Sequence, residues 1–286
     1  MTQKDIEGVA VLGAGAMGHG IAQICAVAGC RVRLQDLDEA AVAGGVDRIR
    51  ASLDKLVAKG RLDSAARDRA FAAVATTTSL DEACIDADLV IEAIPERMSL
   101  KLELFRTVDR AAPPHAILAT NTSSLSVTEL AGVTARPGLV VGMHFFNPVP
   151  LMELLEIVQG LRTTEQTIDD VRRFASRLGK RPIVVRDSPG FATSRLGVAL
   201  GAEAIRMLEA GVASAQDIDL AMELGYRHPM GPLRLTDLVG LDVRLAVLEH
   251  LHREIGEQFR PPTLLRQMVR AGKLGRKSGE GFYKYE

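Results

Sequence analysis

The chain has 286 residues, of which 47% are hydrophobic and 25% are charged, a composition that predicts an ordinary globular protein of about two domains. Its formal net charge of -1 and its pI near 6.6 argue against nucleic acid or an anionic membrane as a partner. No run of about 18 apolar residues is present, so we expect no membrane-spanning helix.

Cysteine and histidine usage predicts a reducing compartment and no metal site. Cys25, Cys30 and Cys84 are odd in number and lack CxxC spacing, which favours packed, reduced thiols in a cytoplasmic protein. The six histidines are mostly scattered and form no HxxxH pair, so we do not expect metal binding. The polar start, MTQKDIEG, lacks the charged and then apolar pattern of a signal peptide.

The first predicted strand, Val9–Leu12, leads directly into a glycine-rich turn, and we expect a helix of small residues after it. Gly13 permits a tight turn, Gly15 lets the backbone approach a pyrophosphate, and Gly18 lets the helix pack closely on the strand. The N-terminus of that helix offers free N–H groups to phosphate. Glycines that serve only as turns are the alternative. The predicted cofactor contacts in this turn are Gly13, Gly15, Ala16, Met17 and Gly18.

A second predicted strand, Arg31–Asp36, ends in an acid close to the spacing of about 20 residues that dinucleotide-binding sequences show. Asp36 can accept hydrogen bonds from a ribose 2′-hydroxyl and repels a 2′-phosphate, which favours NAD over NADP. Further on, the amphipathic stretch Arg48–Leu62 predicts a helix with cations, including Lys59, on one side. This side suits a phosphorylated substrate tail, or it is a solvated helix face; the residues leave both open.

Three more predicted strands, Asp88–Ile94, Ala116–Ala119 and Leu139–Met143, alternate with helical stretches such as Leu100–Arg110. The alternation predicts an α/β domain with a Rossmann-type, doubly wound parallel sheet. Ligands bind outside the carboxyl ends of the strands in such sheets. We therefore interpret the residues that follow the strands as one rim, with His144 where a nicotinamide ring would lie. These residues are the glycine turn, Asp36, Pro95, Glu96, Thr120, Asn121, Thr122, Ser123 and His144.

The segment HFFNPVPLMELLEI, from His144 to Ile157, contains a carboxylate in an unfavourable place. If Leu151–Val158 is a strand, Glu156 shares a face with apolar side chains, while Glu153 lies on the other, more accessible face. An unpaired buried charge costs several kcal/mol or changes its protonation state. We therefore predict that Glu156 pairs with His144. A glutamate on a solvated edge and a satisfied core histidine are the alternative.

The second half of the chain is predicted to be helical. A break at Arg186–Gly190 divides the chain into a dinucleotide-binding domain, residues 1–185, and an all-helical domain, residues 186–286. The small residues around Gly197 permit close helix packing, either within the domain or in a dimer. The helices are expected at Phe191–Ala210, Ser214–Leu224, Asp237–Ile255 and Thr263–Ala271.

From Gly8 to Tyr285 the chain resembles the 3-hydroxyacyl-CoA dehydrogenase family, in particular its short-chain 3-hydroxybutyryl-CoA type. The resemblance rests on VLGAGAMGHGIAQ, LVIEAIPE, ATNTSSLS, GMHFFNPVPLMELLEIV, DSPGFATSR, MGPLRLTDLVGLD and GRKSGEGFYKY. It implies NAD-dependent oxidation of (S)-3-hydroxyacyl-CoA to 3-oxoacyl-CoA and the reverse reaction. It also implies an acyl-CoA thioester as the partner and a homodimer.

The resemblance implies a role for each matching residue. His144 would be the general base and acid, Glu156 would orient its imidazole, and Ser123 would bind the reacting oxygen, with Asn147 in the same pocket. Ser194 stands where many relatives have asparagine; its shorter hydroxyl could still bind the substrate oxygen, and its role is open. Further implied contacts are Glu96, Lys101, Asn121, Ser123 and Lys277 for the cofactor, and Ser52 and Lys59 for coenzyme A.

Two other functions fit parts of this pattern. One is a dehydrogenase of a free hydroxy acid or a carnitine-like substrate, which substrates with and without coenzyme A would distinguish. The other is a non-catalytic NAD-binding protein, and the presence of His144, Glu156 and Ser123 together argues against it, because a binding module needs no proton acceptor at a strand end.

Overall fold

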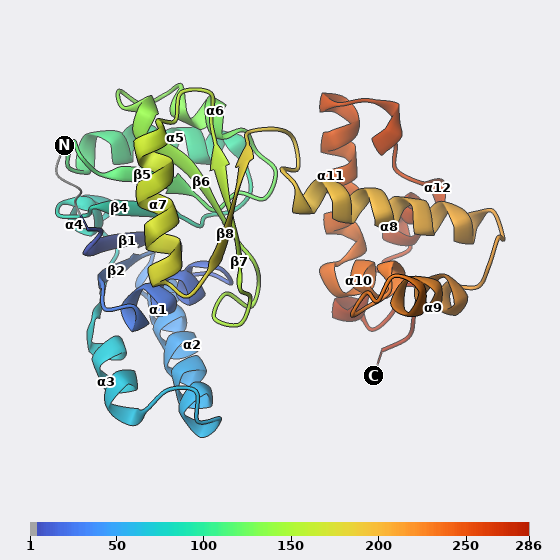
Figure 1. Ribbon diagram of the computed structural model, residues 1–286, viewed down its shortest axis with the longest axis horizontal. Coiled ribbons are helices and arrows are strands. Elements are labelled where there is room, and N and C mark those ends of the chain that lie inside the picture. The colour runs from blue at the N-terminus through green and yellow to red at the C-terminus, as the bar shows by residue number, and fades with distance from the viewer. Residues whose placement is uncertain (1–4, 286) are drawn as a thin grey trace. The chain divides into compact units, whose positions relative to one another are not determined.

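The computed structural model describes residues 5–285, and in it the chain divides into two compact units, Met1–Asp187 and Ser188–Glu286 (Figure 1). The N-terminal unit contains a sheet of eight strands, and the C-terminal unit is helical. The predicted α/β fold followed by an all-helical part is confirmed. None of the helices within residues 5–285 is both long and apolar enough to cross a bilayer.

The sheet of the N-terminal unit has the order β3-β2-β1-β4-β5-β6-β7-β8. All neighbouring strands are parallel except β6 and β7, which form an antiparallel pair. The chain turns back across β1, since β2 and β3 lie on one side of it and β4 on the other, and the carboxyl ends around such a reversal form a ligand-binding crevice. The strands are β1 (Gly8–Leu12), β2 (Arg31–Gln35), β3 (Val74–Thr77), β4 (Leu89–Glu92), β5 (Ile117–Thr120), β6 (Val140–Phe145), β7 (Leu154–Gln159) and β8 (Arg181–Arg186).

Helices cover both faces of this sheet (Figure 1). Ile21 of α1 and Phe174 of α7 belong to the apolar core on one face, together with Val11 and Ile91 from the central strands. β1 and β4 are buried along their whole length. The packing of these side chains therefore fixes the positions of the strand ends that border the crevice. The helices are α1 (Gly18–Val27), α2 (Glu39–Ala58), α3 (Ser64–Ala72), α4 (Leu80–Cys84), α5 (Met98–Ala111), α6 (Val127–Ala131) and α7 (Glu165–Arg177), with a 3₁₀ turn η1 at Pro137–Leu139.

Three expectations for this unit are wrong in their boundaries. The strand expected at Leu151–Val158 is β7, which begins only at Leu154. The helix expected at Arg48–Leu62 is the second half of α2, which begins at Glu39 because Asp38 caps it by accepting from the N–H of Ala41. The strand expected to stop at Met143 continues to Phe145, so His144 lies inside β6 and not after it. Strands β3 and β8 were not predicted.

The C-terminal unit packs its helices around a separate core that includes Val198, Leu233 and Leu248. The single helix expected at Asp237–Ile255 is wrong, because Gly240 has φ +105° and separates two helices. Buried Asp237 accepts hydrogen bonds from the backbone N–H groups of Phe282 and Tyr283, which ties the C-terminal segment to this core. The elements are α8 (Thr193–Glu209), α9 (Ala215–Gly225), α10 (Pro232–Val239), α11 (Leu241–Glu254), η2 (Glu257–Phe259), α12 (Thr263–Arg270) and η3 (Arg276–Ser278).

Candidate active site

The glycine turn between β1 and α1 leaves room for a ligand against its backbone. Gly13 has φ +99°, a conformation that favours glycine. A Cβ on Gly18 would lie 1.7 Å from the carbonyl oxygen of Gly13, so only glycine permits this contact between turn and helix. A Cβ on Gly15, in contrast, would meet no atom within 4 Å, and this residue is exposed. The turn therefore presents open backbone beside the N-terminus of α1, which fits the pyrophosphate of a dinucleotide.

Asp36 follows β2 directly and stands beside the glycine turn. Its carboxylate accepts from the backbone N–H groups of Ala14 and Leu37, each at 2.7 Å. These two bonds fix the carboxylate and leave lone pairs for ribose hydroxyls. The residues present at this position therefore fit the adenosine half of NAD.

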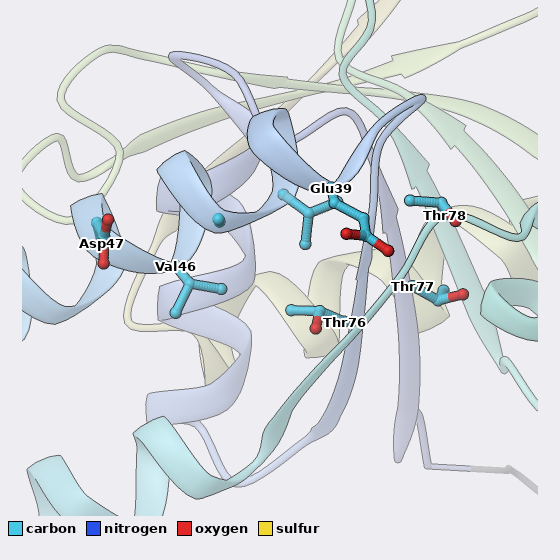
Figure 2. Close-up of a pocket in the computed structure, with 8 residues that line it drawn as sticks. Glu39, Val46, Asp47, Thr76, Thr77 and Thr78 are labelled. Carbon is cyan, nitrogen blue, oxygen red and sulfur yellow. The ribbon is translucent and has the colours of Figure 1, made fainter.

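A hollow of about 480 Å³ opens near the start of α2, between this helix and the end of β3. Figure 2 shows Glu39 of α2 facing the threonines that end and follow β3, with Asp47 further along the helix. Carboxylates at Asp36, Glu39 and Asp47 make this region unfavourable for the extra phosphate of NADP.

His144 and Glu156 stand directly opposite each other in the antiparallel ladder of β6 and β7. The Nδ1 of His144 lies 2.7 Å from Oε2 of Glu156; the glutamate side chain is fully buried and His144 is 7% exposed. A carboxylate can only accept, so Nδ1 carries the hydrogen and Nε2 of the neutral imidazole is the proton acceptor. The structure thus contains the pair that the sequence predicted.

A second hollow, of about 300 Å³, lies at the carboxyl ends of β4, β5 and β6. It brings His144 together with five of the cofactor and substrate residues expected in the N-terminal unit: Met17, Glu96, Asn121, Ser123 and Asn147. The N–H of Phe145 donates to the side-chain oxygen of Asn121 at 2.9 Å, which joins the end of β6 to the segment after β5. The lining residues are Met17, Ala93, Ile94, Glu96, Asn121, Ser123, His144, Phe145, Phe146 and Asn147.

Glu96 fixes the position of Ser123 in this hollow. Its Oε1 accepts from the backbone N–H of Ser123 at 2.8 Å, from the hydroxyl of Ser123 at 3.2 Å and from the hydroxyl of Thr122 at 2.6 Å. Desolvation acts to raise the pKa of Glu96, but the charge of Lys101 and these hydrogen bonds outweigh it and lower the pKa. Glu96 is therefore ionised and is a hydrogen-bond acceptor at neutral pH.

Lys101 lies behind Glu96 in the protein interior. It is 1% exposed, and its Nζ lies 2.5 Å from Oε1 of Glu92 and 3.2 Å from Oε2 of Glu96. Glu92, at the end of β4, also accepts from the hydroxyl of Thr120 at 2.6 Å. Sequence reasoning missed Glu92, although an acid in the apolar strand LVIEAI is a signal for a buried ion pair.

A third hollow, of about 350 Å³, contains the two residues expected to bind coenzyme A. Ser52 and Lys59 line it from α2 and the residue after it, and Pro148, Pro150 and Leu151 form the facing wall. We call this hollow the basic groove because its other lining residues include His19, Arg48, Lys55 and Arg61. Sequence reasoning did not place His19 or the proline wall here.

Ser194 and Lys277 belong to the C-terminal unit. Ser194 is the second residue of α8 and is half-buried. Lys277 in η3 forms an ion pair with Asp242, with Nζ 2.6 Å from Oδ1. Their expected roles toward substrate and cofactor stay predictions.

A Rossmann-type sheet, an open glycine turn, an acid after β2 and a histidine–carboxylate pair at the strand ends define an NAD-dependent oxidoreductase. Residues 8–188 match the NAD-binding domain of 3-hydroxyacyl-CoA dehydrogenases, and residues 190–285 match their C-terminal domain. The chain belongs to the 3-hydroxyacyl-CoA dehydrogenase family, as its motifs predicted.

Curated relatives and solved structures agree with this assignment over nearly the whole chain. A Bacillus subtilis (strain 168) protein described as a probable 3-hydroxybutyryl-CoA dehydrogenase is 47% identical over 283 residues, 99% of this chain and 98% of that protein. A 3-hydroxybutyryl-CoA dehydrogenase of Clostridioides difficile is 44% identical, over 97% of this chain and 99% of that protein. The crystal structure of (S)-3-hydroxybutyryl-CoA dehydrogenase PaaH1 from Ralstonia eutropha superposes with a TM-score of 0.95 at 45% identity, covering 99% of this chain and 100% of that one.

Proposed function

We propose that the protein oxidises (S)-3-hydroxybutyryl-CoA to the 3-oxo thioester with NAD⁺ and catalyses the reverse reaction, using His144 and Glu156 as its proton-transfer pair. The observation that carries this proposal is the 2.7 Å contact between Nδ1 of His144 and buried Glu156, at the hollow of about 300 Å³ beside the glycine turn. The similarity to dehydrogenases described as acting on 3-hydroxybutyryl-CoA supports the short acyl chain.

The chain's own side chains account for the proton chemistry. Bound NAD⁺ supplies the hydride acceptor. Nε2 of His144 takes the proton of the substrate 3-hydroxyl in the oxidation and returns it in the reduction. Glu156 holds Nδ1–H and stabilises the imidazolium by charge. Ser123, fixed by Glu96, offers its hydroxyl to the reacting oxygen, and Asn147 adds a polar side chain to the same hollow.

Cofactor binding is assigned to the residues that surround the glycine turn. Asp36 takes the ribose hydroxyls, and Glu96 and Asn121 line the hollow toward the nicotinamide side. Lys101 acts through Glu96, because it is 1% exposed and its ammonium contacts two carboxylates. Lys277 is the proposed cofactor contact from the C-terminal unit. The turn residues proposed for the pyrophosphate are Gly13, Gly15, Ala16, Met17 and Gly18.

Coenzyme A is assigned to the basic groove. Its phosphates need cations, and α2 and the residues after it supply several side by side. Ser52 and Lys59 are the proposed contacts. This assignment favours the first of the two interpretations of the amphipathic helix.

The all-helical domain, residues 186–286 by sequence, is proposed to supply Ser194 for the substrate oxygen and the contacts of a homodimer. Large exposed apolar side chains on this unit support an interface with a second copy. They include Leu196, Leu220, Leu224, Tyr226, Leu238 and Val243. The mass of the protein in solution tests the dimer.

A cytoplasmic location is also proposed. Cys25, Cys30 and Cys84 are free and buried, and burial raises the pKa of each thiol, as expected of unreactive packing residues. Free thiols are common in reducing compartments. Fractionation of cells with an antibody to the protein tests this location, and recovery outside the cytoplasm would contradict it.

The test of the function is oxidation of NADH by purified protein with acetoacetyl-CoA or with free acetoacetate. We expect rapid turnover of the thioester and far slower turnover of the free acid, because the basic groove contributes binding energy only to the CoA substrate. Equal rates would favour a dehydrogenase of free hydroxy acids. NAD binding without turnover of any thioester would favour a non-catalytic protein.

A further inference from the structure

Residues 146–153 form the loop that joins β6 to β7 (Figure 1). This loop lines two of the hollows described above. Asn147 lines the hollow that contains His144. Pro148, Pro150 and Leu151 form the wall of the basic groove that faces α2. The position of this β6–β7 loop therefore sets the width of the groove proposed for coenzyme A.

The loop has few backbone hydrogen bonds of its own. The N–H groups of Leu151 and Met152 both donate to the carbonyl oxygen of Pro148, at 2.9 and 3.1 Å. The two prolines have no N–H to donate. Local bonding alone thus leaves the carbonyl groups of Val149 and Met152 in need of donors.

Lys180 supplies those donors from the turn between α7 and β8. It is 7% exposed, and its Nζ donates to the carbonyl oxygens of Val149 at 2.5 Å and Met152 at 2.6 Å. Desolvation lowers the pKa of Lys180, while Glu153 acts in the opposite direction. An ammonium is costly to bury unless it is hydrogen-bonded, and these two bonds to the loop compensate that cost.

Helix α1 supports the loop from another side. A Cβ placed on Gly20 would lie only 2.9 Å from Cβ of Val149, so α1 and the loop are in close contact. Val149 is 2% exposed. The loop is therefore held at Val149 by packing on α1 and by the ammonium of Lys180, and at Met152 by the same ammonium.

A buried lysine could also serve only to stabilise the β6–β7 hairpin. The ladder argues against that simpler role, since His144 and Glu156 are held opposite each other by strand pairing that continues on both sides of them. Both acceptors of Lys180 lie in the loop and neither lies in β6 or β7. Loss of the ammonium would thus loosen the groove wall before it disturbs the catalytic pair.

We infer that Lys180 is a positioning residue for the coenzyme A moiety: it holds the β6–β7 loop against the basic groove without touching the reacting atoms. This inference rests on the proposed function, which assigns the nucleotide part of the thioester to that groove. It separates binding of the CoA tail, which depends on Lys180, from proton transfer, which depends on His144.

The test compares Lys180→Met with the wild-type protein on two substrates, acetoacetyl-CoA and acetoacetyl-pantetheine, with NADH as the reductant. Methionine fills a similar volume but donates no hydrogen bond. We expect KM for acetoacetyl-CoA to rise about tenfold, with kcat changed by less than about threefold. KM for acetoacetyl-pantetheine, which lacks the nucleotide, is expected to stay within about twofold of the wild-type value.

Arg172→Met is the matched control, because it removes one positive charge from the half-exposed surface of α7, where the guanidinium of Arg172 pairs with Asp169. It is expected to change neither KM. If Lys180→Met does not fold, Lys180→Gln keeps a neutral N–H donor group on a shorter side chain and should show a smaller rise in KM for the CoA substrate alone. Equal losses on both thioesters, or no change on either, would overturn the role of Lys180.

The wild-type protein provides a separate check on the proposed function. If it uses both thioesters with the same kcat/KM, the basic groove does not bind the nucleotide, and the assignment of coenzyme A fails before Lys180 is considered. If it prefers acetoacetyl-CoA and Lys180→Met keeps that preference, only the inference about Lys180 is wrong.

Discussion

Glu156 shows how a single buried charge can be anticipated from sequence. It occupies a strand position whose neighbours are apolar, and its side chain is fully buried. A carboxylate there requires a partner, and the facing position in the ladder provides His144. The pairing followed from alternation along the strand and from the cost of burying a charge, whereas the register that makes the two residues direct neighbours could not be read from sequence.

Replacement of Glu156 by glutamine tests its proposed role in orienting the imidazole. The amide keeps the shape of the side chain but loses the charge that stabilises an imidazolium, and it can place a donor where Nδ1–H needs an acceptor. We expect kcat to fall by about 10²-fold or more and the pH profile of kcat to change, with the circular dichroism spectrum unchanged. A variant with the wild-type rate and pH profile would show that Glu156 is only structural.

The position of Lys101 could not be inferred from the resemblance to the family alone. Its motif position suggested a place near the cofactor, and the structure places it in the interior between Glu92 and Glu96. The partner Glu92 contributes the buried charge that makes the ammonium tolerable. Sequence alone does not show that two acids and a lysine from β4, the following loop and α5 converge.

At the scale of elements, most of the strands that were predicted are buried along all or most of their length. β1 and β4 are continuous apolar runs, which is the pattern of a central parallel strand. β3 has four residues and exposes part of its surface, and β8 is an exposed edge strand that contains Pro182. Neither has a periodicity that distinguishes a strand from a loop, so the full eight-stranded sheet could not be predicted.

The ends of several helices are set by capping residues that the sequence analysis only partly identified. Asp63 accepts from the N–H of Ala66 and begins α3, while Gly60 with φ +65° follows the end of α2. These two residues divide a stretch that has continuous helical character by composition. Gly240 divides α10 from α11 in the same way. A glycine with positive φ is a reliable helix end in the structure, but in sequence it is indistinguishable from a glycine tolerated inside a helix.

The candidate site was predictable to the extent that it follows strand ends. The glycine turn, Asp36, Asn121 and Ser123 come directly after β1, β2 and β5, where parallel sheets bind ligands. His144, within β6, lines the same hollow as Asn121 and Ser123. The sequence did not distinguish a groove for a phosphorylated tail from a solvated helix face at Arg48–Leu62. The proline wall that completes the groove comes from a loop about 90 residues further along the chain. No sequence pattern indicated a role for Lys180, because its partners are backbone carbonyl groups, which every residue has.

At the scale of the whole molecule, the proposed dimer makes a clear prediction. The apolar side chains exposed on α8, α9, α10 and α11 would be costly to leave in water. We expect sedimentation equilibrium at micromolar concentration to give twice the 30.8 kDa mass of the chain. A mass of one chain at that concentration would rule out a stable homodimer. The exposed apolar side chains of the C-terminal unit would then have another function.

The central claim is that His144 transfers the proton of the 3-hydroxyl group. The most direct measurement is kcat for reduction of acetoacetyl-CoA by NADH in the wild-type protein and in His144→Asn. Asparagine can place a side-chain N–H near the position of Nδ1, so it preserves a donor for buried Glu156 while it removes Nε2. We expect a loss of about 10²–10⁴-fold in kcat, with NADH binding and the folded state retained. A variant that turns over at the wild-type rate would contradict this claim.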